Sequence, residues 1–291
     1  MLSESRIKDF FTFVNERHAI YVRRSRGDEW PWTEDPILQS YKFTNIFREL
    51  DTGTIWCREN IREPYAYHPE LFFNIALYRM YNYIPTAKFL GFIENYDQHY
   101  VDDLHERHKH CKVFTSAHML NGLSRIDKVS SVFGMSGTDL WNKRREVCPQ
   151  PGDTLEQAFK RLNGHVFGFG GFLAFEAITD LRHTRYLDNA SDIQTWANPG
   201  PGCKRGIGRL LGLPVWTRHG TRPTKEDIKK FPKEKEMLEI MRILLDLSDK
   251  LPRWIPPLEM RDIEHSLCEF DKYERVRLGE GRLKHKYHYG G

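Results

Sequence analysis

Residues 30–51 hold the densest set of side chains that could do chemistry. Two tryptophans and two prolines come first, and a run rich in polar residues follows them. A tryptophan gains free energy only when it is buried or stacked, so two so close together predict a rigid corner. On a helix, the spacing of the polar residues would place them on one face. We expect either a charged ridge beside a binding site or a packed lid with a solvated ridge. The candidates are Trp32, Asp35, Lys42, Asn45, Arg48 and Glu49.

Two polar residues stand in a second segment, residues 69–81, which is otherwise apolar at its centre. Asn74 lies between Leu71 and Leu77. A buried amide costs free energy unless it is hydrogen-bonded. Asn74 is therefore either an amide that reads a base or substrate, or a satisfied asparagine of the core. Arg79, one turn further on, is a candidate for binding an anion.

A glycine-rich turn, residues 163–171, separates two predicted helices. Gly168, Gly170 and Gly171 let the backbone approach a phosphate, and the start of the next helix would turn free N–H groups toward it. Helix-hairpin-helix modules grip a DNA backbone in this way, and close packing of two helices is the alternative. Glu176 lies on the second helix. Asp192 lies beyond it, where such DNA glycosylases carry a functional aspartate, and a plain helix N-cap is the other interpretation.

The loop Asn198-Pro-Gly-Pro-Gly precedes two cations at the start of a predicted helix. Cations at a helix N-terminus oppose the helix dipole, and a bound phosphate would relieve that conflict. We therefore expect an anion site here, with a purely structural loop as the alternative. Its residues are Asn198, Gly200, Gly202, Lys204 and Arg205.

Near the C-terminus, Asp262, His265 and Glu269 share one face of a predicted helix, and Lys272 follows them. This face is either a general-base site or a solvated set of salt bridges. The histidine-rich run 99–110 has no companion pair with zinc-ligand spacing, so we expect no metal and no cofactor.

Helical periodicity predicts the elements that position these residues. We expect helices over 4–24, 69–81, 85–91, 97–108, 153–163, 172–182, 235–251 and 259–270, with a short one capped by Thr224. Strand signals at 112–115 and 213–216 are short and ambiguous. The expected fold is mainly α, a single domain spanning 1–291 with two lobes and a boundary near 146–153.

Composition restricts the class of protein. The 291 residues include 29% charged residues and 40% hydrophobic ones, an ordinary globular balance. No apolar run is long enough for a membrane span and no signal peptide is recognisable, so we expect a cytoplasmic protein. Five scattered cysteines favour reduced thiols. The net charge is +4, with basic clusters at 23–26, 143–145, 204–205 and 282–286, which favours nucleic acid as a partner, although each cluster alone could be a solvated helix end.

Together these motifs resemble one family. The blocks Pro31-Trp32-Thr33-x-Asp35-Pro36 and Tyr41-x-Phe43-Thr44-Asn45-x-x-Arg48-Glu49-x-Asp51 look like the signature of the helical domain of 5-hydroxymethyluracil DNA kinases and of amino acid:DNA transferases, formerly alpha-glutamyl/putrescinyl-thymine pyrophosphorylases. The segments at 72–79, 168–171, 198–206 and 262–272 fit as well, so the resemblance covers about 20 to 280. The kinases carry a P-loop domain, and these residues contain no P-loop, so the transferases fit better.

The resemblance implies a phage enzyme with a fold distantly similar to helix-hairpin-helix DNA glycosylases, which would work in the cytoplasm of the host. It would replace pyrophosphate on 5-(pyrophosphoryloxymethyl)uracil in DNA with an amino acid or another amine, and release pyrophosphate. The flipped base needs aromatic walls, for which Trp30, Trp32 and Trp196 are candidates.

The same chemistry assigns roles to the charged candidates. Lys42, Arg48, Arg79 and Arg205 would stabilise the departing pyrophosphate. Asp35, Glu49, Glu176 and Asp262 compete as the group that deprotonates the amine. Two alternatives stay open. One is a glycosylase-like enzyme on modified pyrimidines. The other is a non-catalytic DNA-binding module that partners a hydroxymethyluracil DNA kinase, in which the cations would face solvent or salt bridges.

Overall fold

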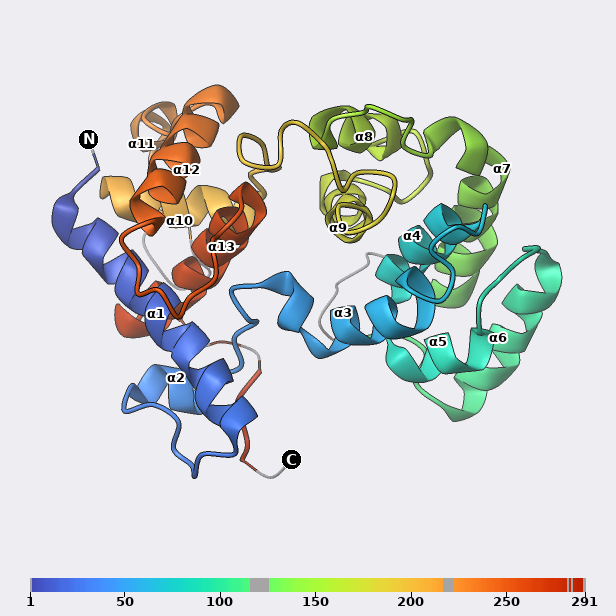
Figure 1. Ribbon diagram of the computed structural model, residues 1–291, viewed down its shortest axis with the longest axis horizontal. Helices are drawn as coiled ribbons and strands as arrows, with labels where there is room; N and C mark the ends of the chain where they lie inside the picture. Colours follow the sequence, from blue (N-terminus) through green and yellow to red (C-terminus); the bar gives the residue numbers. More distant parts are fainter. Residues whose placement is uncertain (1, 116–125, 217–221, 282, 284, 290–291) are drawn as a thin grey trace. The chain divides into compact units, whose positions relative to one another are not determined.

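The computed structural model describes residues 2–115, 126–216, 222–281, 283 and 285–289. Within these ranges the chain is built from helices, and extended segments pair at one isolated antiparallel bridge between Tyr41 and Lys286 (Figure 1). The mainly α prediction is therefore confirmed. Residues 282 and 284 of the C-terminal basic cluster lie outside the described residues. Among those described, no helix is both long and apolar enough to cross a membrane.

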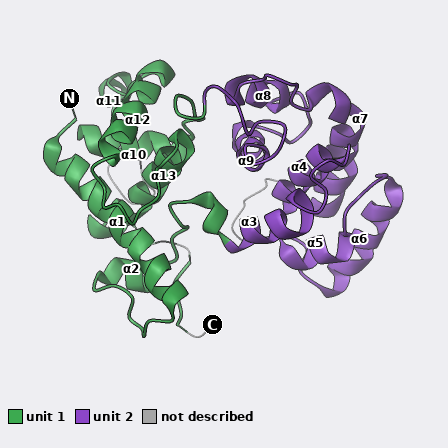
Figure 2. Cartoon of the chain, viewed as in Figure 1, with its two compact units in different colours: residues 1–51, 193–291 green, residues 52–192 purple. Residues whose placement is uncertain are grey.

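The chain forms two compact units (Figure 2). Unit 1 combines Met1–Asp51 with Ile193–Gly291, and unit 2 is the continuous stretch Thr52–Asp192. The lobe boundary expected near 146–153 instead falls inside unit 2. The Pro- and Gly-rich loop at that position joins two helices that pack on each other, so it acts as a tight connection rather than as a linker.

Unit 1 is organised around α13 (Met260–Arg277), the last helix of the described chain. Its other elements are α1 (Glu4–Arg26), α2 (Pro36–Ser40), the short 3-10 turn η1 (Arg48–Leu50), α10 (Pro201–Leu211), α11 (Lys225–Lys229) and α12 (Glu234–Ser248). Helix α13 packs against α1, α2, α10 and α12. Phe10 and Phe13 of α1 contact Phe270 of α13, with ring centroids 5.5 and 5.9 Å apart. This apolar seam fixes the polar side chains that α1 and α13 carry on their other faces.

The close approach of α10 to α13 depends on glycine. A Cβ added at Gly206 would fall on the backbone carbonyl of Leu267, and one added at Gly202 would fall on the Cys268 sulfur. Any larger side chain would push the helices apart, because both neighbours are parts of α13. Gly202, predicted to cradle an anion, thus has a packing role.

Unit 2 surrounds a buried helix. Its elements are α3 (Thr52–Cys57), the wide turn η2 (Arg58–Arg62), α4 (Leu71–Tyr81), α5 (Ile84–Leu90), α6 (Gln98–His110), η3 (Ser130–Gly137), α7 (Thr138–Val147), α8 (Leu155–Leu162) and α9 (Gly171–Leu181). Every residue of α4 is buried, and α4 packs on α7, α9, η2 and η3. The polar side chains of α4 must therefore find partners inside the unit.

The polar residues of 42–49 do not lie on a helix, so the shared helix face considered for them is wrong. Residues 42–47 have no regular secondary structure, and only the turn η1 follows. Asn45 donates from its side chain to the Leu50 carbonyl, and Asp51 accepts from the Asn45 backbone N–H. These local bonds offer the backbone an alternative to a helix. The segments 112–115 and 213–216 form no strand.

Candidate functional site

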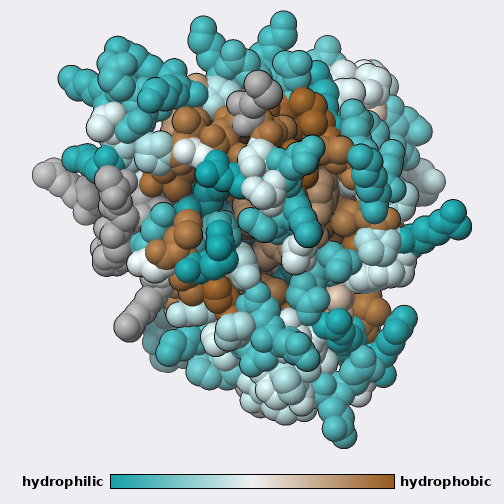
Figure 3. All heavy atoms as spheres, turned by 90° about the vertical axis from the view of Figure 1, so that its left-hand side faces the viewer, coloured by the Kyte–Doolittle hydropathy of each residue, from teal (hydrophilic) through white to brown (hydrophobic). Residues whose placement is uncertain are grey.

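A cleft of about 640 Å³ opens in unit 1 between α1, α13 and the segment that joins α1 to α2. We call it the α1–α13 cleft. On the face drawn in Figure 3, hydrophilic side chains predominate and hydrophobic ones gather in separate patches between them. The lining of the cleft is likewise mixed, with apolar walls and several charged groups. It consists of Asp9, Thr12, Phe13, Asn15, Glu16, Arg23, Pro31, Trp32, Thr33, Glu34, Asp35, Leu38, Tyr273, Glu274 and Arg277.

The charge of this cleft is negative. Both arginines are already paired, Arg23 with Glu16 at 2.9 Å and Arg277 with Glu274 through two bonds of 2.6 and 2.7 Å. Three further carboxylates, Asp9, Glu34 and Asp35, form no salt bridge with the described residues of the lining, although Asp9 lies in the electric field of Arg277. An excess of carboxylates on a concave surface attracts cations and repels phosphate.

Asp35 is an acid of the cleft whose two carboxylate oxygens both accept hydrogen bonds. Its Oδ1 accepts from the N–H groups of Ile37 and Leu38 at 2.8 and 3.0 Å, which caps α2. Its Oδ2 accepts from the Tyr273 hydroxyl at 2.6 Å. Burial, followed by the negative charge of Asp35, raises the pKa of Tyr273 above its usual range. Asp35 therefore shapes the cleft and has its lone pairs largely committed.

Three other residues of the lining offer acceptors for hydrogen bonds. Within the described residues, the carboxylates of Asp9 and Glu34 have no hydrogen bond or ion pair. The Asn15 side-chain oxygen is buried and also lacks a partner in the described part of the chain. Acceptors of this kind suit a ligand that carries several N–H donors.

Trp32 forms part of the wall of the cleft. Its Nε1 donates to the Asp28 carbonyl at 2.7 Å, and its ring meets Trp30 edge to face at 5.2 Å between centroids. Trp30 in turn stacks on Tyr287 and Tyr289 of the C-terminal segment, both at 5.4 Å. The two tryptophans are in contact as the predicted corner requires, and Trp30 is stacked on aromatic rings of its own chain.

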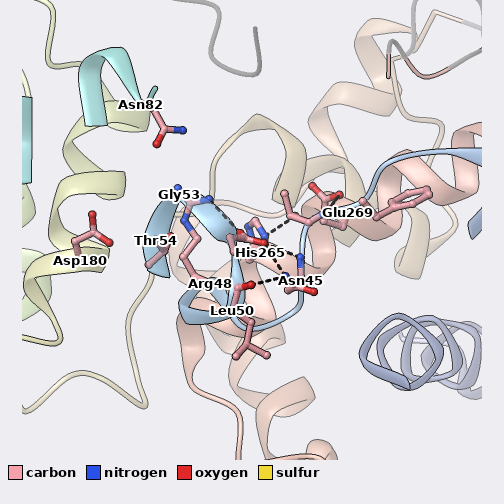
Figure 4. A network of polar contacts seen from close by, with 12 residues as sticks. Asn45, Arg48, Leu50, Gly53, Thr54, Asn82, Asp180, His265 and Glu269 are labelled. Atoms are coloured by element: carbon pink, nitrogen blue, oxygen red, sulfur yellow. Dashed lines mark hydrogen bonds and ion pairs between the residues drawn. The ribbon is translucent and has the colours of Figure 1, made fainter. Parts of the chain in front are cut away.

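Two of the remaining candidates, Asn45 and Arg48, belong to a separate polar network (Figure 4). Asn45 accepts from Arg17 at 2.9 Å and donates to Asp51 at 3.0 Å, and Arg48 pairs with Asp51 at 3.4 Å. Burial raises the pKa of Asp51, although the nearby Arg48 opposes the shift. Glu49 is half-buried in η1 and Lys42 is exposed. Of the described residues that line the cleft, none is Lys42, Asn45, Arg48 or Glu49.

The same network ties this segment to α13. The Thr44 hydroxyl and the His265 Nε2 are 2.7 Å apart, and the Thr44 backbone N–H donates to Glu269 at 3.2 Å. Glu269 also pairs with Lys272. Asp262 lies elsewhere on α13, where it accepts from the Glu259 N–H at 2.9 Å and completes the helix cap. The predicted general-base face is thus divided between a cap and a set of structural contacts.

Arg79 and Asp180 form a buried ion pair in unit 2. Their side chains are 1% and 0% exposed, and Asp180 accepts from both Nε and a terminal nitrogen of Arg79. A further bond of 2.9 Å joins Arg79 to the Thr54 hydroxyl. Burial disfavours the charged guanidinium, but the charge of Asp180 and its hydrogen bonds outweigh that effect and raise the pKa of Arg79. Glu176, also buried, adds a smaller contribution in the same direction.

Two further candidates of unit 2 have local structural partners. Asn74 donates to the Glu70 and Ile93 carbonyls at 3.0 and 2.9 Å, and its oxygen accepts from the Ile93 N–H at 2.9 Å. It is a satisfied core asparagine. Asp192 accepts from the first two N–H groups of α8, at 2.7 and 3.0 Å, so it is a helix cap for α8 rather than for its own segment.

The glycines of the hairpin between α8 and α9 differ in their surroundings. Gly168 has φ +80°, and a Cβ there would lie 2.5 Å from the Ser136 hydroxyl, so backbone shape and packing both require glycine. Gly170 is the N-cap of α9, and a Cβ added to it would meet nothing within 4 Å. Gly171 begins the helix. Of Gly168 and Gly170, Gly170 is therefore the one with space beside its Cα atom.

The second glycine loop ends in a salt bridge. Gly200 is the N-cap of α10, Asn198 is half-buried just ahead of it, and Lys204 is exposed. Arg205 pairs with Asp271 of α13 at 2.7 Å. Asp271 therefore supplies the negative charge for which the sequence suggested a bound phosphate.

Sequence reasoning missed four acids of the cleft: Asp9, Glu16, Glu34 and Glu274. Asp9 and Glu16 are seven residues apart on α1, which places them on one helix face. That spacing was a usable signal. The approach of α13, which brings Tyr273 and Glu274 to the same place, has no local signal in the sequence.

Comparisons with known proteins give a consistent result. The sequence model of the helical domain of 5-hmdU DNA kinase matches residues 4–282. A 5-hmdU DNA kinase of Bacillus phage SP10 is 27% identical over 290 residues, which cover 91% of this chain and 44% of that protein. The chain thus spans less than half the length of this relative. No solved structure matches the chain.

Proposed function

Because the chain belongs to the family of the helical domain of 5-hmdU DNA kinase, we propose that it acts on DNA that contains modified 5-hydroxymethyluracil. More specifically, it replaces pyrophosphate on 5-(pyrophosphoryloxymethyl)uracil with an amino acid or another amine. The amine nitrogen forms a bond to the exocyclic methylene carbon. The carbon–oxygen bond breaks, its electron pair leaves with pyrophosphate, and the amine gives up a proton.

The negative charge of the α1–α13 cleft carries the amine-binding part of this proposal; because that charge repels phosphate, no residue of the cleft is assigned to the pyrophosphate. Before it reacts, the amine is an ammonium ion with three N–H donors. Within the described residues, Glu34 offers a carboxylate with no hydrogen bond or ion pair, Asp9 offers one that lies in the field of Arg277, and Asn15 offers a buried acceptor. We assign Glu34, which is exposed, the task of holding the ammonium group and receiving its proton. Trp32 supplies an aromatic wall, which also favours a cation.

The experiment uses DNA that carries 5-(pyrophosphoryloxymethyl)uracil. The protein is incubated with this DNA and a panel of amino acids and polyamines, and the DNA is then digested to nucleosides that are weighed by mass spectrometry. We expect a new nucleoside whose mass equals the base plus one amine, with release of pyrophosphate. If no amine in the panel changes the nucleoside profile, the proposal fails.

A matched pair of variants tests the assignment to the cleft. Glu34→Gln should raise the amine concentration for half-maximal rate about tenfold or more, because it removes a charge that faces the ammonium group. Glu239→Gln, on the exposed face of α12, should leave that concentration unchanged. Equal behaviour of the two variants would exclude Glu34 as the amine-binding residue.

One observation favours a second candidate, a non-catalytic DNA-binding module that serves a hydroxymethyluracil DNA kinase. Arg48, Arg79 and Arg205 are all held in salt bridges, which that alternative requires of them. The same assay separates the candidates. A module would add no amine to the DNA and would instead increase the rate of an added kinase.

A further inference from the structure

Unit 2 presents an exposed cluster of aromatic and cationic side chains away from its core. We call it the Tyr67 patch; it consists of Tyr67, Arg145, Arg185 and Tyr186. The Arg185 guanidinium lies over the rings of Tyr67 and Tyr186, at 5.7 and 5.2 Å from their centroids. It also donates to the His68 carbonyl at 3.5 Å. The patch therefore joins the turn before α4 to the loop after α9.

The Tyr67 ring is unusually accessible. It is 83% exposed, more than any other large apolar side chain that is exposed in the described residues. An aromatic ring in water loses the free energy that stacking or burial would provide. Its neighbour Arg185 is a cation, which orients the ring without covering it. One face of the ring is thus available for a planar partner.

The charge around the ring is positive. Arg145 has a side chain that is 62% exposed, and it shares the carboxylate of Glu70 with Arg144. Arg161 pairs with Asp153. Glu70 and Asp153 are only 8% and 11% exposed, so their charges face the protein, whereas Arg145 and Arg185 face solvent. The patch consequently has an excess of cations at its surface.

The surroundings of Cys148 show independently that these cations converge. Burial raises the pKa of this thiol to about 11, while the charges of Arg145, Arg185 and Arg161 act in the opposite direction. The three arginines come from α7, the loop after α9 and α8. They lie within electrostatic reach of one sulfur atom, so the positive field is concentrated at one place.

We infer that the Tyr67 patch binds an unpaired segment of DNA, with a base stacked on Tyr67 and phosphates near Arg145 and Arg185. Stacking on an exposed ring combined with guanidinium contacts to the backbone is how proteins hold single strands. In a duplex, each base is already stacked on its neighbours, so the ring would gain little. This inference rests on the proposed function, which makes DNA the substrate, and it adds a site outside the cleft.

The test measures binding separately from chemistry. Fluorescence anisotropy follows the full chain with a labelled thymidine strand of about 20 nucleotides that carries no modified base. Tyr67→Ala should weaken binding at least about fivefold, because stacking of one base is lost, whereas Tyr67→Phe should bind like the wild type. Arg185→Ala should weaken binding and make log K less steep against log salt by about 0.7, the value for one phosphate on a single strand.

Arg253→Ala is the matched control, since it removes an exposed arginine from unit 1. It should change neither the affinity nor the salt dependence. Thermal unfolding of every variant verifies that Tyr67→Ala and Arg185→Ala are folded.

The inference is overturned if the wild type does not bind the strand, or if folded Tyr67→Ala and Arg185→Ala bind it as tightly as the wild type does. It is also overturned if the two variants weaken binding of duplex DNA alone. These outcomes leave the amine-transfer assay untouched, because nucleoside masses report the chemistry. A failure of the patch and a failure of the proposed function are thus seen in different measurements.

Discussion

The buried pair of Arg79 and Asp180 should control the stability of unit 2. Removing Arg79 leaves the buried Asp180 carboxylate with the more distant guanidinium of Arg62 at 4.0 Å, and removing Asp180 takes the carboxylate away from both buried arginines. Such a change costs about 3–5 kcal/mol in other proteins. We expect a loss of this size for Arg79→Met and for Asp180→Leu separately. The double variant should lose less than the sum of the two single losses, because neither residue leaves the other unpaired, although the buried Arg62 still lacks the Asp180 carboxylate.

Native-state hydrogen exchange is the suitable assay, because a chain with two units need not unfold in one step. Each single variant should lower the protection of the amides of α4 and α9 by about two to three and a half orders of magnitude, which corresponds to the expected free energy. The amides of α13 in unit 1 should keep their protection. Lys109→Met serves as the control. It removes one partner of a pair that is 65% and 64% exposed, and should change stability by no more than about 1 kcal/mol.

Two results would refute this reasoning. If the single variants lose less than about 1 kcal/mol, the pair is not desolvated as the structure indicates. If the double variant loses the full sum, the two side chains do not act on each other. The double variant also tests a functional role for Arg79. Retained amine transfer in the folded double variant would exclude this arginine from the stabilisation of pyrophosphate.

Three other predictions concern packing, capping and thiol chemistry. Gly206→Ala should destabilise unit 1 by about 1–3 kcal/mol because the new Cβ meets the Leu267 carbonyl, and a silent Gly206→Ala would contradict the α10–α13 packing. Gly170→Ala, whose Cβ meets nothing within 4 Å, should cost less than about 1 kcal/mol, the loss expected when alanine replaces glycine at an N-cap. Asp35→Ala should lower the free energy of unfolding in urea by about 1–2 kcal/mol because α2 loses its cap, and Tyr273→Phe should lower it by about 1 kcal/mol. If the double variant loses the sum of the two, the 2.6 Å contact between these side chains does not stabilise the protein. Exposed Cys111 should react with iodoacetamide at pH 8 well before Cys148, because burial raises the pKa of the Cys148 thiol to about 11. Since this pKa is raised on folding, the protonated Cys148 adds to the free energy of unfolding below about pH 9, and this contribution is lost as the pH rises toward 11. Cys148→Ala should therefore show a smaller loss of stability over that pH range in unfolding curves.

Local patterns in the sequence predicted the helices well. The buried stripe of α12 contains Met237, Met241 and Leu244 as expected, while Ile240 is half-buried. Thr224 caps α11 as predicted, because a side-chain oxygen near a free N–H is a strictly local interaction. The N-terminus of α8 was predicted too early, at 153, and Thr154 is its cap. Such features need no knowledge of the rest of the chain.

The candidate site was harder to predict, because its residues meet across long sequence separations. Arg79 and Asp180 are 101 residues apart, and Asp35 and Tyr273 are 238 apart. An exposed cation and a buried, paired one look the same in sequence, which is why Arg79 and Arg205 were expected to bind anions. The segment 42–49 was misread for a different reason. Its spacing fits a helix, but Asn45 and Asp51 hydrogen-bond to the backbone and hold another conformation.

The order of the two units along the chain has a consequence for synthesis. Unit 2 is one continuous stretch, whereas unit 1 needs α1 together with α10 and α13, which lie more than 170 residues later. On the ribosome, unit 2 can finish folding while Phe10 and Phe13 of α1 still lack the Phe270 ring of α13. The apolar face of α1 therefore stays exposed in the nascent chain until α10 and α13 have been synthesised. A chain truncated within α13 should keep this face of α1 exposed and should aggregate. A chaperone that binds residues 4–26 should raise the yield of the untruncated chain.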